Sequence, residues 1–375
     1  MYIPYGRQSI DENDIKAVEE VLRSDYLTTG PKIEEFERKV AAYTGAKYAV
    51  AIANGTAALH AACYAAEIGE GDEVITTPIT FAASSNCVLY CGGKPVFADI
   101  DEKTYNISPE DIERKITSAT KAIIAVHFTG QPCEMEKIHN IARKHNLIVI
   151  EDAAHALGAQ YKGKMVGSIS DMTTFSFHPV KHITTGEGGM ILTNNDRLYQ
   201  RLKLFRTHGI TRDDKLMTKN DGPWYYEQLE LGFNYRITDI QCALGISQMD
   251  KLPEFLNRRK NIAARYNEAF ADNDNIQIPY QESGCDNAWH LYVIRMKNGK
   301  RKEVFEKLRK AGIGVNVHYI PVYQHPYYRN HGYKDTICSN AEEYYKECIS
   351  LPLYPGLKDE EQGYVIKKVL EFANS

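Results

Sequence analysis

The chain has 375 residues, 25% of them charged, and a formal net charge of −4. The two signs are interspersed, so no basic stripe is offered to a nucleic-acid backbone, and no apolar run approaches the roughly 18 residues of a membrane span. Residues 1–7 lack the basic and apolar pattern of a secretory signal. We therefore expect a cytoplasmic enzyme that acts on small molecules.

Two helices are predicted near the start of the chain. The first can be capped by either of two pairs, Ser9 with Glu12 or Asp11 with Asp14. The second is expected to begin near Pro31 and to end at Gly45. Residues 26–30 form the loop between them.

From residue 48 to about 194, short apolar runs alternate with helical stretches, which is typical of a mostly parallel sheet covered by helices. Two of the runs follow each other without a long helix and indicate a local antiparallel or mixed arrangement. Asp152 stands just past the end of one run, where ligands collect in such sheets. The expected strands are 48–53, 73–77, 95–99, 122–127, 147–151, 173–177 and 189–193.

The rest of the chain is predicted to form a functional loop and a second domain. Residues 212–228 are polar, aromatic and too long for an ordinary connection. The elements expected after that loop are helices at 238–251 and 253–271, a strand at 289–296 and a helix at 302–311. We predict an α/β fold with a large cofactor-binding domain over residues 1–250 and a smaller C-terminal α+β domain over residues 251–375.

Lys181 and Asp152 carry the clearest chemistry. An acid at the end of an apolar run, with an isolated lysine after a strand-like run, suits pyridoxal 5′-phosphate (PLP). The lysine forms a Schiff base with the cofactor aldehyde, the aspartate keeps the ring nitrogen protonated, and the displaced amine can move protons. The plainer alternatives are a solvated surface lysine and an aspartate that caps a helix. The adjacent acid Glu151 points to the opposite face of the strand, so it cannot pair with Asp152.

A phosphate site is predicted where Gly55 and Thr56 end a strand and open a helix. The free N–H groups and the helix dipole attract a phosphate there, although a glycine at such a turn often serves backbone geometry alone. Ser176 can add a hydroxyl to the same phosphate. His155 either flanks the cofactor or is a structural histidine.

No metal site is predicted. His178 and His182 have a spacing of four, but Pro179 between them opposes a regular helix and no third ligand follows. The eight cysteines are scattered and are expected to be free thiols.

Ordered blocks along the whole chain resemble one family of enzymes. The blocks are residues 27–31, 54–60, 77–81, 151–158, 175–189, 206–210, 232–236 and 350–353. They are similar to the fold type I aminotransferases of sugar nucleotides, the family named for the DegT, DnrJ, EryC and StrS proteins. Within it, residues 177–189 and 314–321 most resemble the branch that acts in pseudaminic acid biosynthesis.

This resemblance implies a homodimeric PLP transaminase. L-glutamate would give its amino group to the cofactor, which would deliver it to C4 of a UDP-linked 4-keto-6-deoxy sugar. Phe81 would stack on the cofactor ring, and Asn234 would reach the phosphate of the partner subunit's cofactor. Asn316 stands where close relatives often carry glutamine. The implied contacts to the sugar or uridine are Thr28, Trp224, Tyr225, His318 and Tyr319.

The residues also bear on other classes of protein. Related dehydratases replace the Schiff-base lysine by histidine, and Lys181 argues against that reaction. A NAD-dependent sugar dehydrogenase needs a Gly-rich turn after its first strand, which the sequence lacks. Two alternatives stay open. One is 4-amination of another nucleotide sugar, such as the D-xylo 4-keto sugar that leads to bacillosamine or a UDP-4-keto pentose. The other is a noncatalytic sugar-binding regulator.

Overall fold

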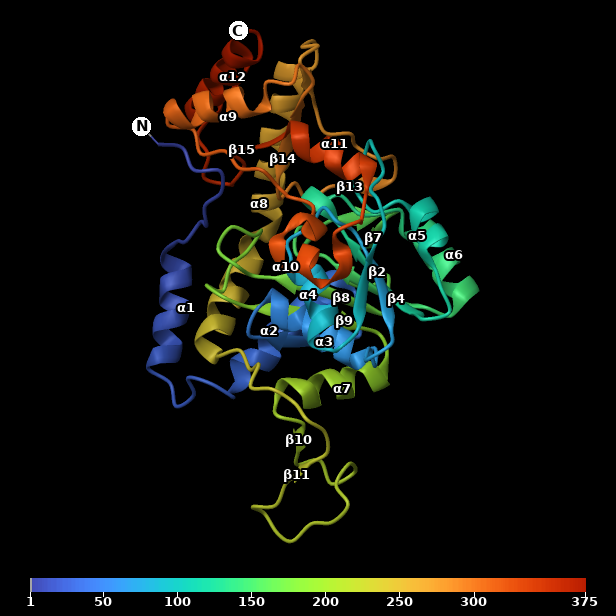
Figure 1. Cartoon of the computed structure of the whole chain (residues 1–375). Coiled ribbons are helices and arrows are strands. Elements are labelled where there is room, and N and C mark those ends of the chain that lie inside the picture. Colours follow the sequence, from blue (N-terminus) through green and yellow to red (C-terminus); the bar gives the residue numbers. More distant parts are fainter. Residues whose placement is uncertain (1) are drawn as a thin grey trace.

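The structure is a computed structural model that describes residues 2–375 (Figure 1). Its centre is a seven-stranded sheet in the order β1-β9-β8-β5-β4-β2-β3. β9 runs antiparallel to β1 and β8, and the other neighbouring strands are parallel. The mixed, mostly parallel sheet predicted from the sequence is confirmed. Its strands are β1 (Tyr48–Ile52), β2 (Glu73–Thr76), β3 (Lys94–Phe97), β4 (Thr120–Val126), β5 (Ile148–Asp152), β8 (Met172–Ser176) and β9 (Gly189–Thr193).

Helices cover both faces of this sheet. Val50 and Ile52 of β1 pack on the face of α3, α4 and α7, whereas Ala49 and Ala51 pack on the opposite face with α2 and α8. This alternation arises because successive strand residues point to opposite sides. α5 and α6 cover β2, β4 and β5 on the side of α2 and α8. The helices are α2 (Pro31–Thr44), α3 (Gly55–Ala65), α4 (Ala83–Tyr90), α5 (Pro109–Lys115), α6 (Met135–His145), α7 (Asp196–Arg206) and α8 (Asp239–Phe270).

The start of the first helix and the end of the second lie at capping residues that the sequence predicted. α1 (Glu12–Leu22) is capped by Asp11, whose side chain accepts from the Asp14 N–H while Asp14 accepts from the Asp11 N–H. Of the two pairs proposed as caps, this one forms the capping box. α2 ends at Gly45, where φ is 77°, a left-handed conformation that glycine adopts without a Cβ clash.

The helix α8 corrects one prediction. The sequence predicted two helices, at 238–251 and 253–271, because a proline usually interrupts a helix. The structure has one helix of 32 residues with Pro253 inside it. Leu252 and Phe255 are buried on either side of the proline, so packing keeps the chain helical there. The predicted division into residues 1–250 and 251–375 stays a prediction, and its boundary falls inside this helix.

The C-terminal part builds a second, smaller sheet. β12 (Ile276–Gln277) and β15 (Cys348–Leu351) flank β14 (Tyr292–Met296), and the fully buried Ile3 packs into the same core. A further three-stranded sheet joins β13 (Cys285–Asp286), β6 (Gln160–Tyr161) and β7 (Lys164–Met165). The remaining elements are α9 (Arg301–Lys310), α10 (Pro326–Tyr328), α11 (Ser339–Glu347), α12 (Asp359–Ala373) and the short turns η1 (Phe128–Gly130), η2 (Val322–Gln324) and η3 (Arg329–Tyr333).

A hairpin arm projects beyond α7 at the lower end of Figure 1. It consists of β10 (Ile210–Thr211), β11 (Glu227–Gln228) and the loop between them. This arm is the segment predicted to be a functional loop. Among residues 2–375, no helix is long and apolar enough to cross a membrane.

Candidate active site

Asp152 ends β5 on the sheet face covered by α3 and α4. Its Oδ2 accepts a 2.6 Å hydrogen bond from the hydroxyl of Ser84 on α4, and its Oδ1 accepts one of 3.2 Å from the Ala154 N–H. Only 5% of the residue is exposed. Because both oxygens accept, the side chain is a fixed carboxylate at the carboxyl end of the sheet. It is the last residue of its strand, whereas the sequence placed it one position beyond.

Lys181 lies on the loop that joins β8 to β9. The loop folds back on itself, because the Phe177 N–H donates to Gly188 O and the Lys181 N–H donates to His178 O, both at 2.9 Å. Burial lowers the pKa of Lys181 to about 8, the charge of Asp152 raises it and that of Arg259 lowers it further. Much more of this amine is neutral near physiological pH than in an ordinary lysine, which makes it a better nucleophile.

The predicted phosphate site is assembled at the start of α3. Asn54 caps the helix by accepting the Ala57 N–H at 2.8 Å, and the first-turn N–H groups of Gly55 and Thr56 have no helical acceptor. A Cβ added to Gly55 would lie 2.9 Å from Ser176 Cβ, so glycine permits this close approach. Free N–H groups at a helix N-terminus beside a hydroxyl fit a phosphate.

Buried histidines lie beside Lys181. His155 Nε2 is 3.3 Å from the Tyr319 hydroxyl, and its buried Nδ1 has no partner within residues 2–375. The His290 ring is 4.4 Å from the His155 ring, between centroids. Burial, followed by the charge of Lys181, holds the pKa of both histidines well below the usual value. Both rings are therefore neutral, and the unpaired Nδ1 of His155 fits a polar substituent of a cofactor.

His318 is engaged by its own chain. Its Nδ1 is 2.7 Å from Ser350 Oγ and its Nε2 is 3.2 Å from Asn316 Nδ2, while burial lowers its pKa to about 4. Tyr319 connects this segment to His155. The structure thus brings Tyr319 to the site, and the charge of nearby Lys181 also acts on His318. A contact of either residue with a sugar stays a prediction.

Phe81 lies next to the Asp152 site and at the surface. Its side chain is 65% exposed, which is unusual for a phenylalanine, and its carbonyl accepts the Ser84 N–H at 3.2 Å. Ser84 thus connects the Phe81 backbone to Asp152, and an exposed aromatic ring on this segment is suited to stacking on a planar heterocycle.

Thr28 and Asn234 both lie at the surface. Each forms an isolated bridge, Thr28 with Thr238 and Asn234 with Thr207. Asp239, the first residue of α8, accepts the N–H groups of Gly30 at 2.7 Å and Lys32 at 2.9 Å, where the loop enters α2. α8 therefore fixes the position of the segment that carries Thr28.

Trp224 and Tyr225 lie in the arm. The Trp224 side chain is 72% exposed, and the Tyr225 hydroxyl donates to Glu227 Oε1 at 3.0 Å. Hydrogen bonds from the hydroxyl and N–H of Thr218 lower the pKa of Glu227 to about 2. Glu227 thereby organises the arm, which projects beyond α7 (Figure 1).

Residues 8–370 match the sequence profile of the DegT/DnrJ/EryC1/StrS aminotransferase family. The chain belongs to this family. Aminotransferases of the family use PLP, so the predictions of enzyme class, fold type I architecture and cofactor are confirmed. The aminotransferase is a sugar aminotransferase, like its structural neighbours.

Three relatives align over nearly their full length. Spore coat polysaccharide biosynthesis protein SpsC of Bacillus subtilis is 42% identical, with 98% of this chain and 96% of the relative covered. The UDP-4-amino-4,6-dideoxy-N-acetyl-beta-L-altrosamine transaminase of Campylobacter jejuni is 39% identical, with 97% and 95% covered. The structure of Helicobacter pylori PseC, an aminotransferase of pseudoaminic acid biosynthesis, superimposes with a TM-score of 0.93 at 34% identity and covers all of both chains.

The sequence alone did not reveal several residues of the site. Ser84 could have been suspected, because Thr80 and Ser84 follow a strand and are four residues apart, the spacing of one helix turn. In the structure their hydroxyls are 2.7 Å apart. His290 and Arg259 gave no such signal, because each comes from a distant part of the chain. Arg259 is fully buried and donates to the carbonyls of Trp289, His290 and Leu353.

Proposed function

We propose that this aminotransferase moves the amino group of L-glutamate to C4 of a UDP-linked 4-keto-6-deoxy-N-acetylhexosamine. The sugar nucleotide is UDP-2-acetamido-2,6-dideoxy-β-L-arabino-hex-4-ulose, and the pathway is pseudaminic acid biosynthesis. The observation that carries the proposal is the full-length similarity to the Campylobacter transaminase and to PseC. The similarity to SpsC keeps another nucleotide sugar as the second candidate.

The cofactor site combines residues from four segments. PLP, when bound, supplies an aldehyde that takes up the amine and a ring that withdraws electrons from the reacting carbon. Asp152 would contact the ring nitrogen, and Phe81 would cover the ring. Gly55, Thr56 and Ser176 would hold the phosphate, and His155 would contact a ring substituent. The close approach of Gly55 to Ser176 and the unpaired His155 Nδ1 support this arrangement.

Lys181 would attach the cofactor and move protons. Its pKa of about 8 leaves the amine able to accept a proton from the substrate carbon and to return it nearby. The buried, neutral His155 and His290 exclude water from this region without competing as strong bases. Lys181 is thus proposed as both nucleophile and general acid-base group.

The substrate site would be shared between two subunits in a cytoplasmic homodimer. Asn234 is exposed and would reach the phosphate of the partner subunit's cofactor. Thr28, Trp224 and Tyr225 would contact the sugar nucleotide, as would Tyr319 and His318. The exposure of Thr28, Asn234 and Trp224 supports a site completed by a second copy.

The substrate proposal is tested with the enzyme first aminated by L-glutamate. Two UDP-linked 4-keto sugars, the L-arabino compound and its D-xylo epimer, are then added separately, and the recovery of cofactor absorbance is followed. Recovery with the L-arabino sugar alone is expected. Recovery with the D-xylo epimer alone would retain the chemistry and reject the pseudaminic acid assignment.

A further inference from the structure

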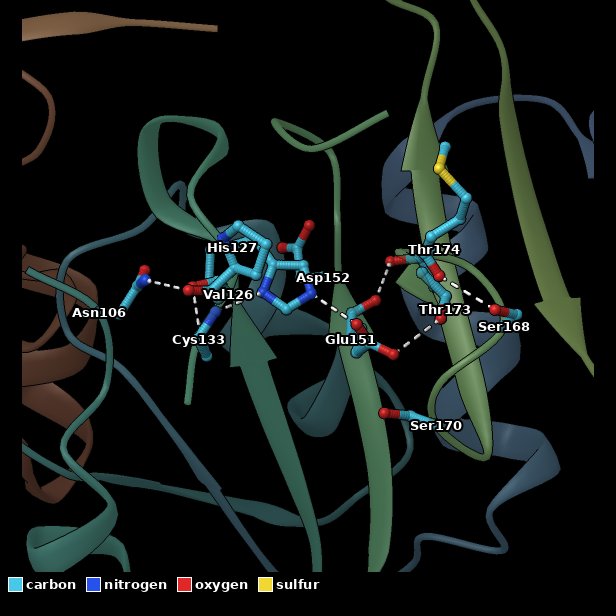
Figure 2. Close-up of polar contacts among 12 residues, drawn as sticks. Asn106, Val126, His127, Cys133, Glu151, Asp152, Ser168, Ser170, Thr173 and Thr174 are labelled. Atoms are coloured by element: carbon cyan, nitrogen blue, oxygen red, sulfur yellow. Dashed lines mark hydrogen bonds and ion pairs between the residues drawn. The ribbon is translucent and has the colours of Figure 1, made fainter. Parts of the chain in front are cut away.

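Behind Asp152, a second carboxylate is fully buried on the other face of the same strand. Glu151 Oε2 is 2.6 Å from His127 Nε2, and neither side chain has any exposed surface. Thr173 of β8 donates its hydroxyl to Glu151 Oε1 at 3.1 Å. Figure 2 shows the His127 ring and the Glu151 side chain facing each other between the ends of β4 and β5.

The hydrogen bonds fix the charges of this pair. His127 Nδ1 accepts the Cys133 N–H at 3.1 Å, so it carries no proton, and a neutral ring must donate from Nε2 to Glu151. Glu151 then accepts from every partner, as a carboxylate does. Burial raises the pKa of Glu151, but the interactions with His127 and the hydrogen bonds from Ser170 and Thr173 together outweigh burial and leave the pKa below its usual value. The pair therefore holds one net negative charge.

Different titratable groups lie on the two faces of the strand. On the Glu151 side, the titratable groups of the neighbouring elements are His127, Cys133 and His139. On the Asp152 side they are Lys181 and Tyr319. Within residues 2–375, the leading interactions that stabilise the charge of Glu151 come from His127, Ser170 and Thr173 and from no lysine or arginine. The field of this buried carboxylate is therefore not cancelled locally, and low polarity strengthens it.

The same histidine connects the two acids. Its side chain binds Glu151, while its backbone N–H donates to Asp152 O at 3.1 Å. Asp152 is held on its own face by Ser84. A change in the position or charge of Glu151 therefore reaches the backbone of Asp152 through His127.

We propose that Glu151 is a positioning residue of the cofactor site, a buried negative charge that acts through Asp152 to help keep a proton on the ring nitrogen of bound PLP. The inference rests on the proposed function, in which Asp152 contacts that nitrogen. Glu151 itself touches neither cofactor nor substrate.

Glu151→Gln is the decisive variant, because it removes the charge and keeps the hydrogen bonds. The amide oxygen can still accept from His127, and the amide NH₂ can donate to the Thr173 hydroxyl, which then turns from donor to acceptor. Thr173→Val is the matched control, because it removes one hydrogen bond to Glu151 and leaves the charge. His127→Phe is a second test variant, because Glu151 loses its closest donor and should take up a proton.

The measurement is solid-state ¹⁵N NMR of holoenzyme reconstituted with PLP labelled at the ring nitrogen, recorded from mildly acidic to alkaline pH. Wild type that fails to take up PLP would reject the proposed function before any variants are compared. We expect Glu151→Gln to release the ring-nitrogen proton about one pH unit below wild type. The midpoint of proton release should also move to lower pH in His127→Phe, and it should equal the wild-type midpoint in Thr173→Val. Unchanged midpoints in Glu151→Gln, or in His127→Phe if the first variant does not fold, would overturn the inference.

Discussion

The hydroxyl of Ser84 donates to Asp152 Oδ2 at 2.6 Å, although the two residues are 68 positions apart. Ser84 opens α4 after β2, and Asp152 ends β5, so two strand ends and one helix start meet at this bond. The bond orients the carboxylate proposed to face the cofactor nitrogen.

Replacement of Ser84 by alanine should impair turnover more than folding. The carboxylate loses a short hydrogen bond and can rotate, so we expect kcat to fall about tenfold, or about 1.4 kcal/mol in the activation barrier. Ser85→Ala is the control, because the neighbouring Ser85 hydroxyl pairs with the Tyr328 hydroxyl at 2.7 Å and not with Asp152. Steady-state kinetics of both variants provide the comparison, and equal kcat values for the two would contradict the orienting role.

The reaction of Lys181 with PLP should depend on pH. The neutral amine is the reactive form, so the rate of PLP uptake by apoenzyme should rise with pH and level off above a midpoint of about 8. The charge of Asp152 raises the pKa of Lys181, so Asp152→Asn should move the midpoint to lower pH. Stopped-flow absorbance measures both profiles. A midpoint that moves to higher pH in Asp152→Asn would contradict the conclusion that the charge of Asp152 raises the pKa of Lys181.

Asp239 should matter for substrate affinity and for stability. It accepts two backbone N–H groups from the segment that carries Thr28, and its side chain is fully buried. Asp239→Asn turns one acceptor into a donor, so we expect the free energy of unfolding to fall by about 2 kcal/mol. KM for the UDP-sugar should rise several-fold while kcat changes little.

The control for Asp239 is Asp250→Asn on the same helix. Asp250 pairs with Lys39 at 2.6 Å, but its side chain is 69% exposed. Such surface pairs contribute little to stability. In Asp250→Asn, the free energy of unfolding measured with urea and the steady-state KM should stay near the wild-type values. An equal loss of stability and of substrate affinity in both variants would count against the proposed role of Asp239.

A shared active site makes a subunit-mixing prediction. Lys181→Ala and Asn234→Ala homodimers should each be nearly inactive. In a mixed dimer, the Asn234→Ala chain supplies Lys181 and the other chain supplies Asn234, so one of two sites is complete. Mixing after dissociation should therefore restore activity well above either parent. Absence of recovery, with mixed dimers shown by mass spectrometry, would place Asn234 outside the partner's site.

The local signals in the sequence predicted the central sheet and the first two helices well. Strand periodicity predicted the strands of the central sheet, one of the two proposed capping pairs marks the start of α1, and Gly45 marks the end of α2. These features depend on neighbouring residues, whose spacing is visible in the sequence. The catalytic expectation for Lys181 had the same basis, together with the family resemblance.

Contacts between distant segments were not predictable in this way. The strand expected at 289–296 begins only at Tyr292, because the N–H groups of Ala288 and His290 donate instead to Gly130 and Thr129. α8 continues through Pro253 because the helix is packed on both sides of it. Glu151 was recognised as pointing away from Asp152, but its buried partner His127 lies 24 residues earlier and gave no sequence signal.

The most direct measurement follows the amino nitrogen itself. Wild-type enzyme and Lys181→Ala are incubated with ¹⁵N-labelled L-glutamate and the UDP-linked L-arabino 4-keto sugar, and the sugar product is analysed by NMR. We expect ¹⁵N bonded to C4 of the sugar with wild type and none with Lys181→Ala. An unlabelled sugar after incubation with PLP-loaded wild type, or equal labelling by both proteins, would contradict amino transfer to this sugar through Lys181.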